Sequence, residues 1–324
     1  MWSNVVWAGE RNGIETSWFG SGYRPTNPTG GREQLKTAMI LTGYLTEFHA
    51  SFCSVSCRDY GTNNLMDAVQ YDNRPTMKRP VLVVAFTGWS DAGVAASTAV
   101  RYLTEQLIAS KFASIDGEDF YDYSIQRPQV RLVEGSQRQI HWPSYDFYYG
   151  SGMGIEKDFV FGTGPEPNLR WKGFSELFLS LAREWNAEMI ITLGAYLDEV
   201  LYTRPVPLTG FGTEKKTMQD LDLIPSRYQG PTGIIGVLGD LFRRSSMPNL
   251  SLWAALPHYL PPSPNPRGAL ALVLKLTQWL GLRIDTTPLE RAAAEFQNKI
   301  NEIVNSDANL SAFIRELKKH EFEQ

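Results

Sequence analysis

The sequence is poor in the residues that build metal centres and disulfide frameworks. It holds two cysteines, Cys53 and Cys57, and four histidines. A single Cys-x3-Cys pair without a second pair is typical of incidental free thiols, so we expect no metal site. The start of the chain also lacks a basic segment followed by an apolar one, so we expect no signal peptide and a cytoplasmic protein.

Long apolar runs, a charge excess and nucleotide-binding loops are missing as well. No run approaches the roughly 20 apolar residues of a membrane-spanning helix, so we expect no membrane partner. The 31 basic and 35 acidic residues give a net charge of −4, without the basic stripe that a nucleic-acid partner requires. Neither GxGxxG nor GxxxxGK(S/T) occurs, so a standard nucleotide loop is excluded and we expect no cofactor.

The first 65 residues differ in composition from the rest of the chain. They are rich in Gly, Thr, Ser and Asn, and their apolar residues follow no sustained period. This pattern predicts an irregular or disordered extension over residues 1–65. Because Met66 and Met77 shortly precede the first strong strand signal, our hypothesis is a natural start at Met66, with the upstream residues as a mis-called leader; the alternative is a genuine disordered tail.

From Pro80 onward, apolar runs alternate with amphipathic segments. Val81 to Phe86 is an unbroken apolar run, as expected for a strand buried on both faces of a parallel sheet. The turn GWSDAG follows, with Ser90 or Asp91 as cap of a helix that runs to about Ser110. The later segments predict strands at 119–124, 130–142, 145–149, 157–162, 189–194 and 252–256, and helices at 171–185 and 230–243, the last capped by Thr232.

This alternation predicts one α/β domain over residues 77–265. Its architecture is a three-layer α/β/α sandwich around a mostly parallel sheet. A proline-rich segment near residue 265 then leads into helices over residues 266–324, which either pack on the domain or extend from it.

Four unusual turns each begin at the carboxyl end of a predicted strand. They read GWSDAG, TGPEPN, AYLDEVLYTRP and PHY. Parallel strands place these ends on one edge, where open α/β sheets bind their ligands. We therefore predict a pocket at this edge formed by Asp91, Glu166, Arg204, Thr232 and His258.

Two kinds of chemistry are conceivable for that pocket. An anion could bind at the helix start at Thr232, with Arg204 as a clamp. A hydrolase would use Ser90, Asp91 and His258, but Ser90 lacks the GxSxG elbow that would expose its hydroxyl. The sequence therefore favours a capping role for Ser90 or Asp91 over catalysis, and we assign no catalytic residue.

The helical tail carries a narrow apolar seam with alternating spacings of four and three residues. Its members are Leu289, Ala293, Phe296, Ile300 and Ile303. One interpretation is a helical hairpin that folds back onto its own domain. The alternative is an interaction helix, with Leu289, Phe296, Ile300 and Ile303 presented to a partner or to a second copy.

Several blocks of the sequence, taken in order, resemble one family. They are GWSDAGVAAS, DFVFGTGPEPNLRW, TRPVPLTG, YQGPTGIIGVL and SLWAALPHYLPPSPNPRGALALV. Together they resemble the proteasome assembly chaperone family of the second-subunit type, from about Met77 to the C-terminus. The bacterial-like members with a long helical tail are the most similar.

The resemblance implies a nucleoside-phosphorylase-like α/β/α sandwich and a scaffold that binds proteasome α-subunits during ring assembly. Two departures limit what it implies. Members that dock with their C-terminus often end in a hydrophobic residue, tyrosine and any residue, whereas this chain ends Phe322-Glu323-Gln324. Relatives also commonly place Pro-His before Thr203, where this chain has Leu201-Tyr202.

Two functional hypotheses follow. The first is a non-enzymatic assembly or chaperone-like protein that associates with itself and with protein partners such as proteasome-like subunits. The second is a ligand-binding protein or enzyme that acts on a nucleotide-like or anionic small molecule at the carboxyl edge. The absence of a nucleophile constellation and the family resemblance favour the first.

Overall fold

The structure is a computed structural model, and it describes residues 65–133, 135, 137–152, 157–260 and 264–322. The chain divides into two compact units, 1–58 and 59–324, and every described residue belongs to the second. The irregular extension predicted for residues 1–65, with both cysteines, lies outside the described residues except for Leu65. In the described part, no helix is long and apolar enough to cross a membrane.

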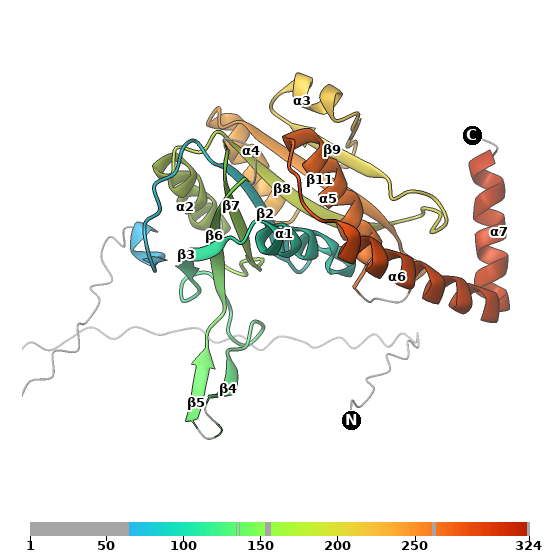
Figure 1. The fold of residues 1–324 in the computed structure, drawn as a ribbon, viewed down its shortest axis with the longest axis horizontal. Helices are drawn as coiled ribbons and strands as arrows, with labels where there is room; N and C mark the ends of the chain where they lie inside the picture. Colours follow the sequence, from blue (N-terminus) through green and yellow to red (C-terminus); the bar gives the residue numbers. More distant parts are fainter. Residues whose placement is uncertain (1–64, 134, 136, 153–156, 261–263, 323–324) are drawn as a thin grey trace, which may run out of the picture. The chain divides into compact units, whose positions relative to one another are not determined.

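A nine-stranded sheet forms the centre of the second unit (Figure 1). Its strands, in spatial order, are β1 (Val69–Tyr71), β3 (Ser110–Asp116), β6 (Ser144–Ser151), β7 (Asp158–Pro165), β2 (Val81–Thr87), β8 (Met189–Asp198), β11 (Asn249–Pro257), β9 (Leu208–Gly212) and β10 (Ile224–Pro225). The four central strands β7, β2, β8 and β11 run parallel. The flanking strands β6 and β9 pair antiparallel with them.

Helices cover both faces of this sheet. They are η1 (Leu65–Ala68), η2 (Ala92–Val94), α1 (Ala95–Gln106), α2 (Trp171–Glu184), α3 (Lys215–Asp220), α4 (Ile234–Arg244), α5 (Pro266–Leu280), α6 (Thr287–Ser306) and α7 (Ala308–Phe322). The helices α1 and α5 pack on one face, and α2 and α4 pack on the other. The predicted α/β/α sandwich is therefore confirmed, with the parallel pairs concentrated at its centre.

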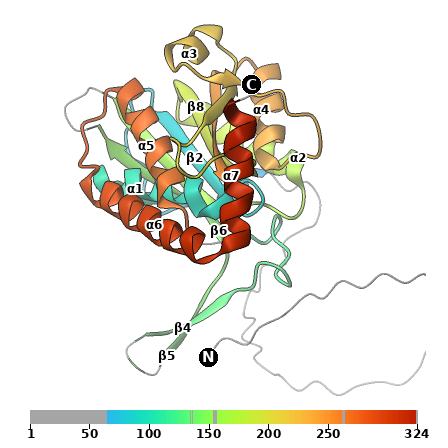
Figure 2. The same ribbon diagram turned by 90° about the vertical axis from the view of Figure 1, so that its right-hand side faces the viewer.

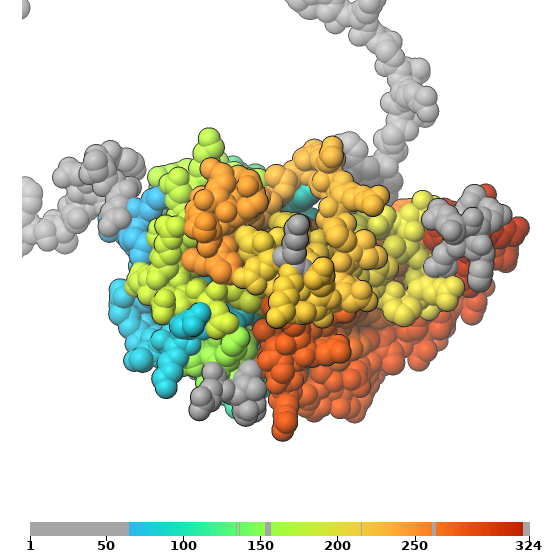
Figure 3. All heavy atoms as spheres, turned by 90° about the horizontal axis from the view of Figure 1, so that it is seen from above, coloured from blue at the N-terminus to red at the C-terminus, as the bar shows by residue number. Residues whose placement is uncertain are grey.

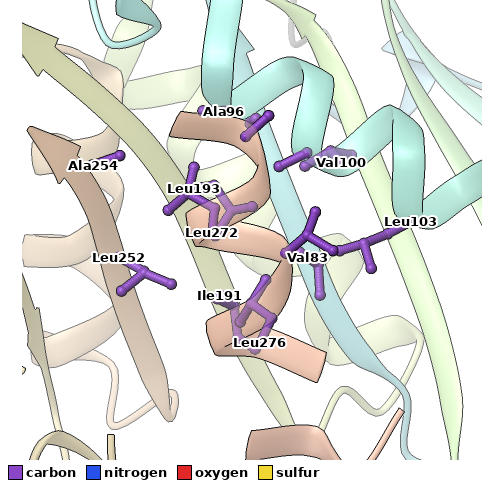
Figure 4. Packing of buried hydrophobic residues seen from close by; sticks show 14 of the residues in the cluster. Val83, Ala96, Val100, Leu103, Ile191, Leu193, Leu252, Ala254, Leu272 and Leu276 are labelled. Carbon is purple, nitrogen blue, oxygen red and sulfur yellow. The ribbon is translucent and has the colours of Figure 1, made fainter. Parts of the chain in front are cut away.

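The apolar run of β2 supplies both layers of the core because successive residues of a strand point to opposite faces. Val81, Val83 and Ala85 face α1 and α5, whereas Leu82 and Val84 face α2 and α4. Figure 4 shows Val83 between Val100 and Leu103 of α1 and the leucines of α5. A strand buried on both faces must be apolar throughout. The unbroken apolar run therefore predicted this strand from the sequence.

Three segments depart from the prediction. Residues 119–124 form turns, and the neighbouring strand is β3, at Ser110–Asp116. Residues 130–142 form a separate antiparallel hairpin of β4 (Gln129–Val133) and β5 (Gln137–His141) instead of one strand. The segment β9–α3–β10 was not predicted, and α3 lies at the surface of the view from above (Figure 3).

The C-terminal helices pack on the domain along part of their length. Leu289 of α6 joins the core beneath α5. Farther along, a second cluster of buried residues joins α6 and α7 to the loops after β8 and β11. Its buried members are Leu201, Tyr202, Ile300, Val304 and Ile314. Figure 2 shows α7 in front of the edge at which β8 ends.

Candidate functional site

Asp91 follows β2 and lies almost completely buried against the start of α1. Its Oδ1 accepts hydrogen bonds from the backbone N–H groups of Ala96, at 2.8 Å, and Ser97, at 3.2 Å. Its Oδ2 accepts a third from the Ser97 hydroxyl at 2.5 Å. The capping role predicted for this position is confirmed, although the carboxylate reaches α1 from the 3-10 turn before it.

Burial raises the pKa of the Asp91 carboxyl, although the hydrogen bonds from Ser97 and Ala96 act in the opposite direction. Burial disfavours the charged form of a carboxyl, whereas hydrogen bonds to its oxygens favour it. The group is therefore a buried structural acceptor whose ionisation is costly. Its three hydrogen bonds are directed to α1 and not to a histidine, so it does not form the acid member of a Ser-His-Asp set.

Glu166 begins the loop after β7 and caps a second helix. Its Oε1 accepts a 2.6 Å hydrogen bond from the backbone N–H of Ile234, the first residue of α4. The positive end of the helix dipole favours a carboxylate at this place. A side chain of this protein thus occupies the helix start at which an anionic ligand was predicted.

The residue at the cap position of α4 is Gly233, so the predicted Thr232 cap is wrong. Thr232 is exposed, and its hydroxyl donates to the Gly233 carbonyl at 3.3 Å. A Cβ at Gly233 would lie 2.6 Å from Glu166 Oε1 and 2.7 Å from Ser90 Oγ, so any larger residue there would force these side chains to move. The sequence did not reveal this cap because Glu166 reaches it from another loop.

Arg204 and His258 lie on the other half of the carboxyl edge. Arg204 is exposed, and its carbonyl accepts a 2.6 Å hydrogen bond from Arg267 Nη2. The His258 ring places Nδ1 at 3.2 Å from the carbonyl oxygen of Asp198 and packs edge-on against Phe313 of α7. Both residues therefore border the cluster that joins the C-terminal helices to the domain.

The five predicted pocket residues thus fall into two groups. Glu166 lies with Thr232 and the Ser90–Asp91 turn around Gly233, whereas Arg204 and His258 lie near α6 and α7. One cavity reaches Arg204, between the loops after β8 and β11, and its volume of about 10 Å³ holds about one water molecule. In the part of the chain that the structure describes, no group of three or more His, Cys, Asp or Glu residues could hold a metal ion.

Arg267, near the start of α5, was missed by the sequence analysis. Its guanidinium donates to the carbonyl oxygens of Tyr202 and Arg204 and so fixes the loop after β8. Burial lowers the pKa of Arg267. An arginine that binds carbonyl oxygens needs no acidic partner at a fixed spacing, so the sequence carries no signal for this role.

Exposed apolar side chains also lie at the carboxyl edge, outside the set of residues predicted for the pocket. Trp89 and Leu197, at the ends of β2 and β8, are each 60% exposed, and Leu169 after β7 is also exposed. Buried apolar side chains could be read from the periodicity, whereas Trp89 and Leu169 lie in turns and Leu197 lies at the exposed end of β8. Large apolar side chains that stay exposed are candidates for contact with other molecules.

The tail residues proposed as an interaction face are unequal in exposure. Leu289 and Ile300 are buried against the chain's own domain, and Phe296 is half-buried beside Ile300. Ile303 is exposed. Most of the seam thus faces the domain itself, as the helical-hairpin interpretation expects.

Comparison with known proteins places the chain in a family. The model of the PAC2 family matches residues 85–304. A PAC2 family protein from Streptomyces avermitilis is 37% identical, with a TM-score of 0.68, over 72% of this chain and 99% of that chain. No curated protein matches the chain.

Two further structures extend the comparison. A proteasome-assembly chaperone homologue from Mycobacterium tuberculosis is 34% identical, with a TM-score of 0.67, over 72% of this chain and 99% of that chain. An archaeal proteasome activator from Pyrococcus furiosus shares the fold at 21% identity, with a TM-score of 0.59, over 72% of this chain and 97% of that chain. The resemblance stated from the sequence blocks is confirmed, and the chain belongs to the PAC2 family.

Proposed function

We propose that this protein is a non-enzymatic, chaperone-like scaffold that binds proteasome-like subunits during their assembly. The observation that carries the proposal is its 34% identity to a proteasome-assembly chaperone homologue over 99% of that chain. The match extends over nearly the whole of that chain and is not confined to a fragment of its core.

The chemistry of the carboxyl edge supports this proposal. Two of its carboxylates, Asp91 and Glu166, are engaged as caps of α1 and α4. A nucleotide-like or anionic ligand would have to displace Glu166 from the start of α4. A scaffold needs no such displacement, because its edge offers apolar side chains directly.

We further propose that the exposed side chains of Trp89 and Leu197 form part of the surface that meets the subunit. Tryptophan is among the residues that contribute most to the affinity of protein interfaces. Replacing both by alanine removes that apolar area and leaves the side chains of both caps, Asp91 and Glu166, unchanged. We expect at least a tenfold loss of affinity, as for a residue worth about 1.4 kcal/mol or more.

The experiment is sedimentation velocity of the purified chain mixed with purified α-type proteasome subunits from the same organism. Trp89→Ala/Leu197→Ala is compared with Ile224→Ala, which changes an equally exposed apolar side chain on β10. Binding that is lost in the first variant and kept in the second supports the proposal. The absence of a complex with the folded wild-type chain refutes it.

A further inference from the structure

The hairpin of β4 and β5 is set apart from the nine-stranded sheet. Its strands pair only with each other among the described residues, and every described residue of both strands is exposed. Figures 1 and 2 show it extending away from the sheet. A two-stranded hairpin alone is at best marginally stable in water, so a covered face would stabilise it.

The pairing register divides the hairpin into two unlike faces. On one face the cross-strand pairs are Val130 with Ile140 and Leu132 with Arg138. Trp142 directly follows the end of β5, and continuing the two-residue alternation from Ile140 assigns it to the same face. On the other face the pairs are polar, apart from Val133, and they are Gln129 with His141, Arg131 with Gln139, and Val133 with Gln137.

The apolar face has the alternation of a buried strand surface, yet it lies in solvent. Its four apolar side chains, Val130, Leu132, Ile140 and Trp142, are between 54% and 66% exposed. Apolar side chains at every second residue of a strand are typical of a sheet face that packs on another layer. Within the described residues, Trp142 packs against the ring of Tyr123, with ring centroids 4.9 Å apart, whereas Val130, Leu132 and Ile140 stay largely in solvent.

The order of side chains along this face makes it complementary to itself. Arg138 and Leu132 lie toward the tip, Val130 and Ile140 in the middle, and Trp142 at the base. Consider a second hairpin packed face to face on the first, related to it by a twofold axis that lies between the two faces and crosses the strands at the middle pair. The tip of each copy then meets the base of the other. Each Arg138 then meets the partner's Trp142, which is a favourable cation–π pairing, and the two Arg138 charges stay apart.

We propose that this hairpin is a self-association arm and that its occupant is the hairpin of a second copy of this chain. The interface pairs the two apolar faces, while Arg131 and His141 remain in solvent. This proposal is independent of the proteasome-like partner proposed above, because it uses a different surface.

The expected affinity is modest. One hairpin face is smaller than the roughly 800 Å² per partner of a standard interface, so the association should be reversible. We therefore expect a monomer–dimer equilibrium across the micromolar range of protein concentration rather than a permanent dimer.

The test is sedimentation equilibrium of the full chain, with a pair of neighbouring variants that differ in the face they change. Leu132→Glu places a charge on the apolar face, and Val133→Glu places the same charge on the polar face. We expect dimerisation to be lost in Leu132→Glu and kept in Val133→Glu. Arg138→Gln removes the cation from both symmetry-related pairs and should weaken the dimer about five- to thirtyfold.

A cross-link locates the contact independently. In a background with Cys53 and Cys57 changed to serine, Val130→Cys should form a disulfide between copies, because residue 130 lies near the twofold axis. Arg131→Cys, on the opposite face, should not. A chain that stays monomeric, or a dimer that is unaffected by Leu132→Glu and is not cross-linked at 130, overturns the proposal. An unchanged thermal melting curve shows that the variants fold.

Discussion

Glu166 Oε1 accepts a 2.6 Å hydrogen bond from the backbone N–H of Ile234, so the loop after β7 caps a helix that begins 68 residues later. The carboxylate lies where the dipole of α4 is positive, and the contact joins two loops of the carboxyl edge. This edge is therefore held by its own charged groups.

We expect Glu166→Ala to lower the free energy of unfolding by about 1 kcal/mol, as for the loss of a helix cap. Glu166→Gln keeps an acceptor oxygen without the charge and should lose less. Urea unfolding measures both effects. Glu176→Ala, an exposed position on α2, serves as the control; an equal effect at both sites would contradict the capping role.

The buried carboxyl of Asp91 predicts an unusual pH dependence. Its pKa is raised in the folded state, so the folded chain holds this proton more tightly than the unfolded chain. Its contribution to stability is then greatest below the unfolded pKa of about 3.8 and is lost as pH rises through the folded pKa. An asparagine side chain does not titrate, so the stability of Asp91→Asn does not show this loss.

The measurement is urea unfolding at a series of pH values. The stability of the wild type minus that of Asp91→Asn should fall as pH rises from below 3.8. The control is Asp240→Asn, because the Asp240 pKa is lowered, first by a hydrogen bond from Arg243. The corresponding difference should rise with pH for Asp240, and the same sign for both residues would refute the account of Asp91.

Gly194 on β8 lies beneath the indole ring of Trp253 on β11, and a Cβ at Gly194 would overlap that ring. Gly194→Ala should therefore displace Trp253 and disturb its 2.8 Å hydrogen bond to Ser251. We expect a loss of about 1–3 kcal/mol, as for other overpacked core sites. Thermal unfolding and tryptophan fluorescence measure the two effects.

The matched substitution is Gly173→Ala within α2. Its new Cβ would meet the nearest atom, on Leu65, at an ordinary 3.5 Å. Because alanine is a better helix residue than glycine, this variant should gain about 0.5–1 kcal/mol. Opposite signs for the two substitutions are the expected result, and destabilisation of equal size in both would contradict the packing at Gly194.

Arg267 fixes the loop after β8 through the carbonyl oxygens of Tyr202 and Arg204. Lysine carries the charge but cannot form the same fork, so Arg267→Lys should leave one of these carbonyls without its partner. We expect a local loss of about 1–3 kcal/mol. Hydrogen exchange in residues 200–207 should then become faster, whereas Arg101→Lys on α1 should leave it unchanged.

The sequence predicted the parts of the fold whose burial is periodic. The apolar run of β2 and the apolar stripe of α2 each identify their element, because one geometry buries all of their apolar residues. The aromatic residues Phe120 and Tyr121 suggested a strand. Their side chains are buried, but the backbone forms a turn in which the Phe120 N–H donates to the Gly117 carbonyl. Aromatic residues favour strands only when a neighbouring strand is present to pair with them.

The candidate site was less predictable than the fold. Asp91 and Glu166 follow the carboxyl ends of β2 and β7. The sequence could predict this location, because it depends only on the order and direction of the strands. What each carboxylate binds depends on contacts between distant loops, such as Glu166 with Ile234. The exposed Trp89 and the loop-fixing Arg267 leave no periodic pattern, so only the three-dimensional structure reveals them.

The most direct test of the proposed function is native mass spectrometry of purified α-type proteasome subunits from the same organism, with and without this chain. The proposal predicts a complex of the chain with the subunits before ring closure, and faster ring formation in its presence. It also predicts that Trp89→Ala/Leu197→Ala abolishes both effects. If rings form at the same rate with and without the folded chain, and no complex between the chain and the subunits is observed, the proposal is contradicted.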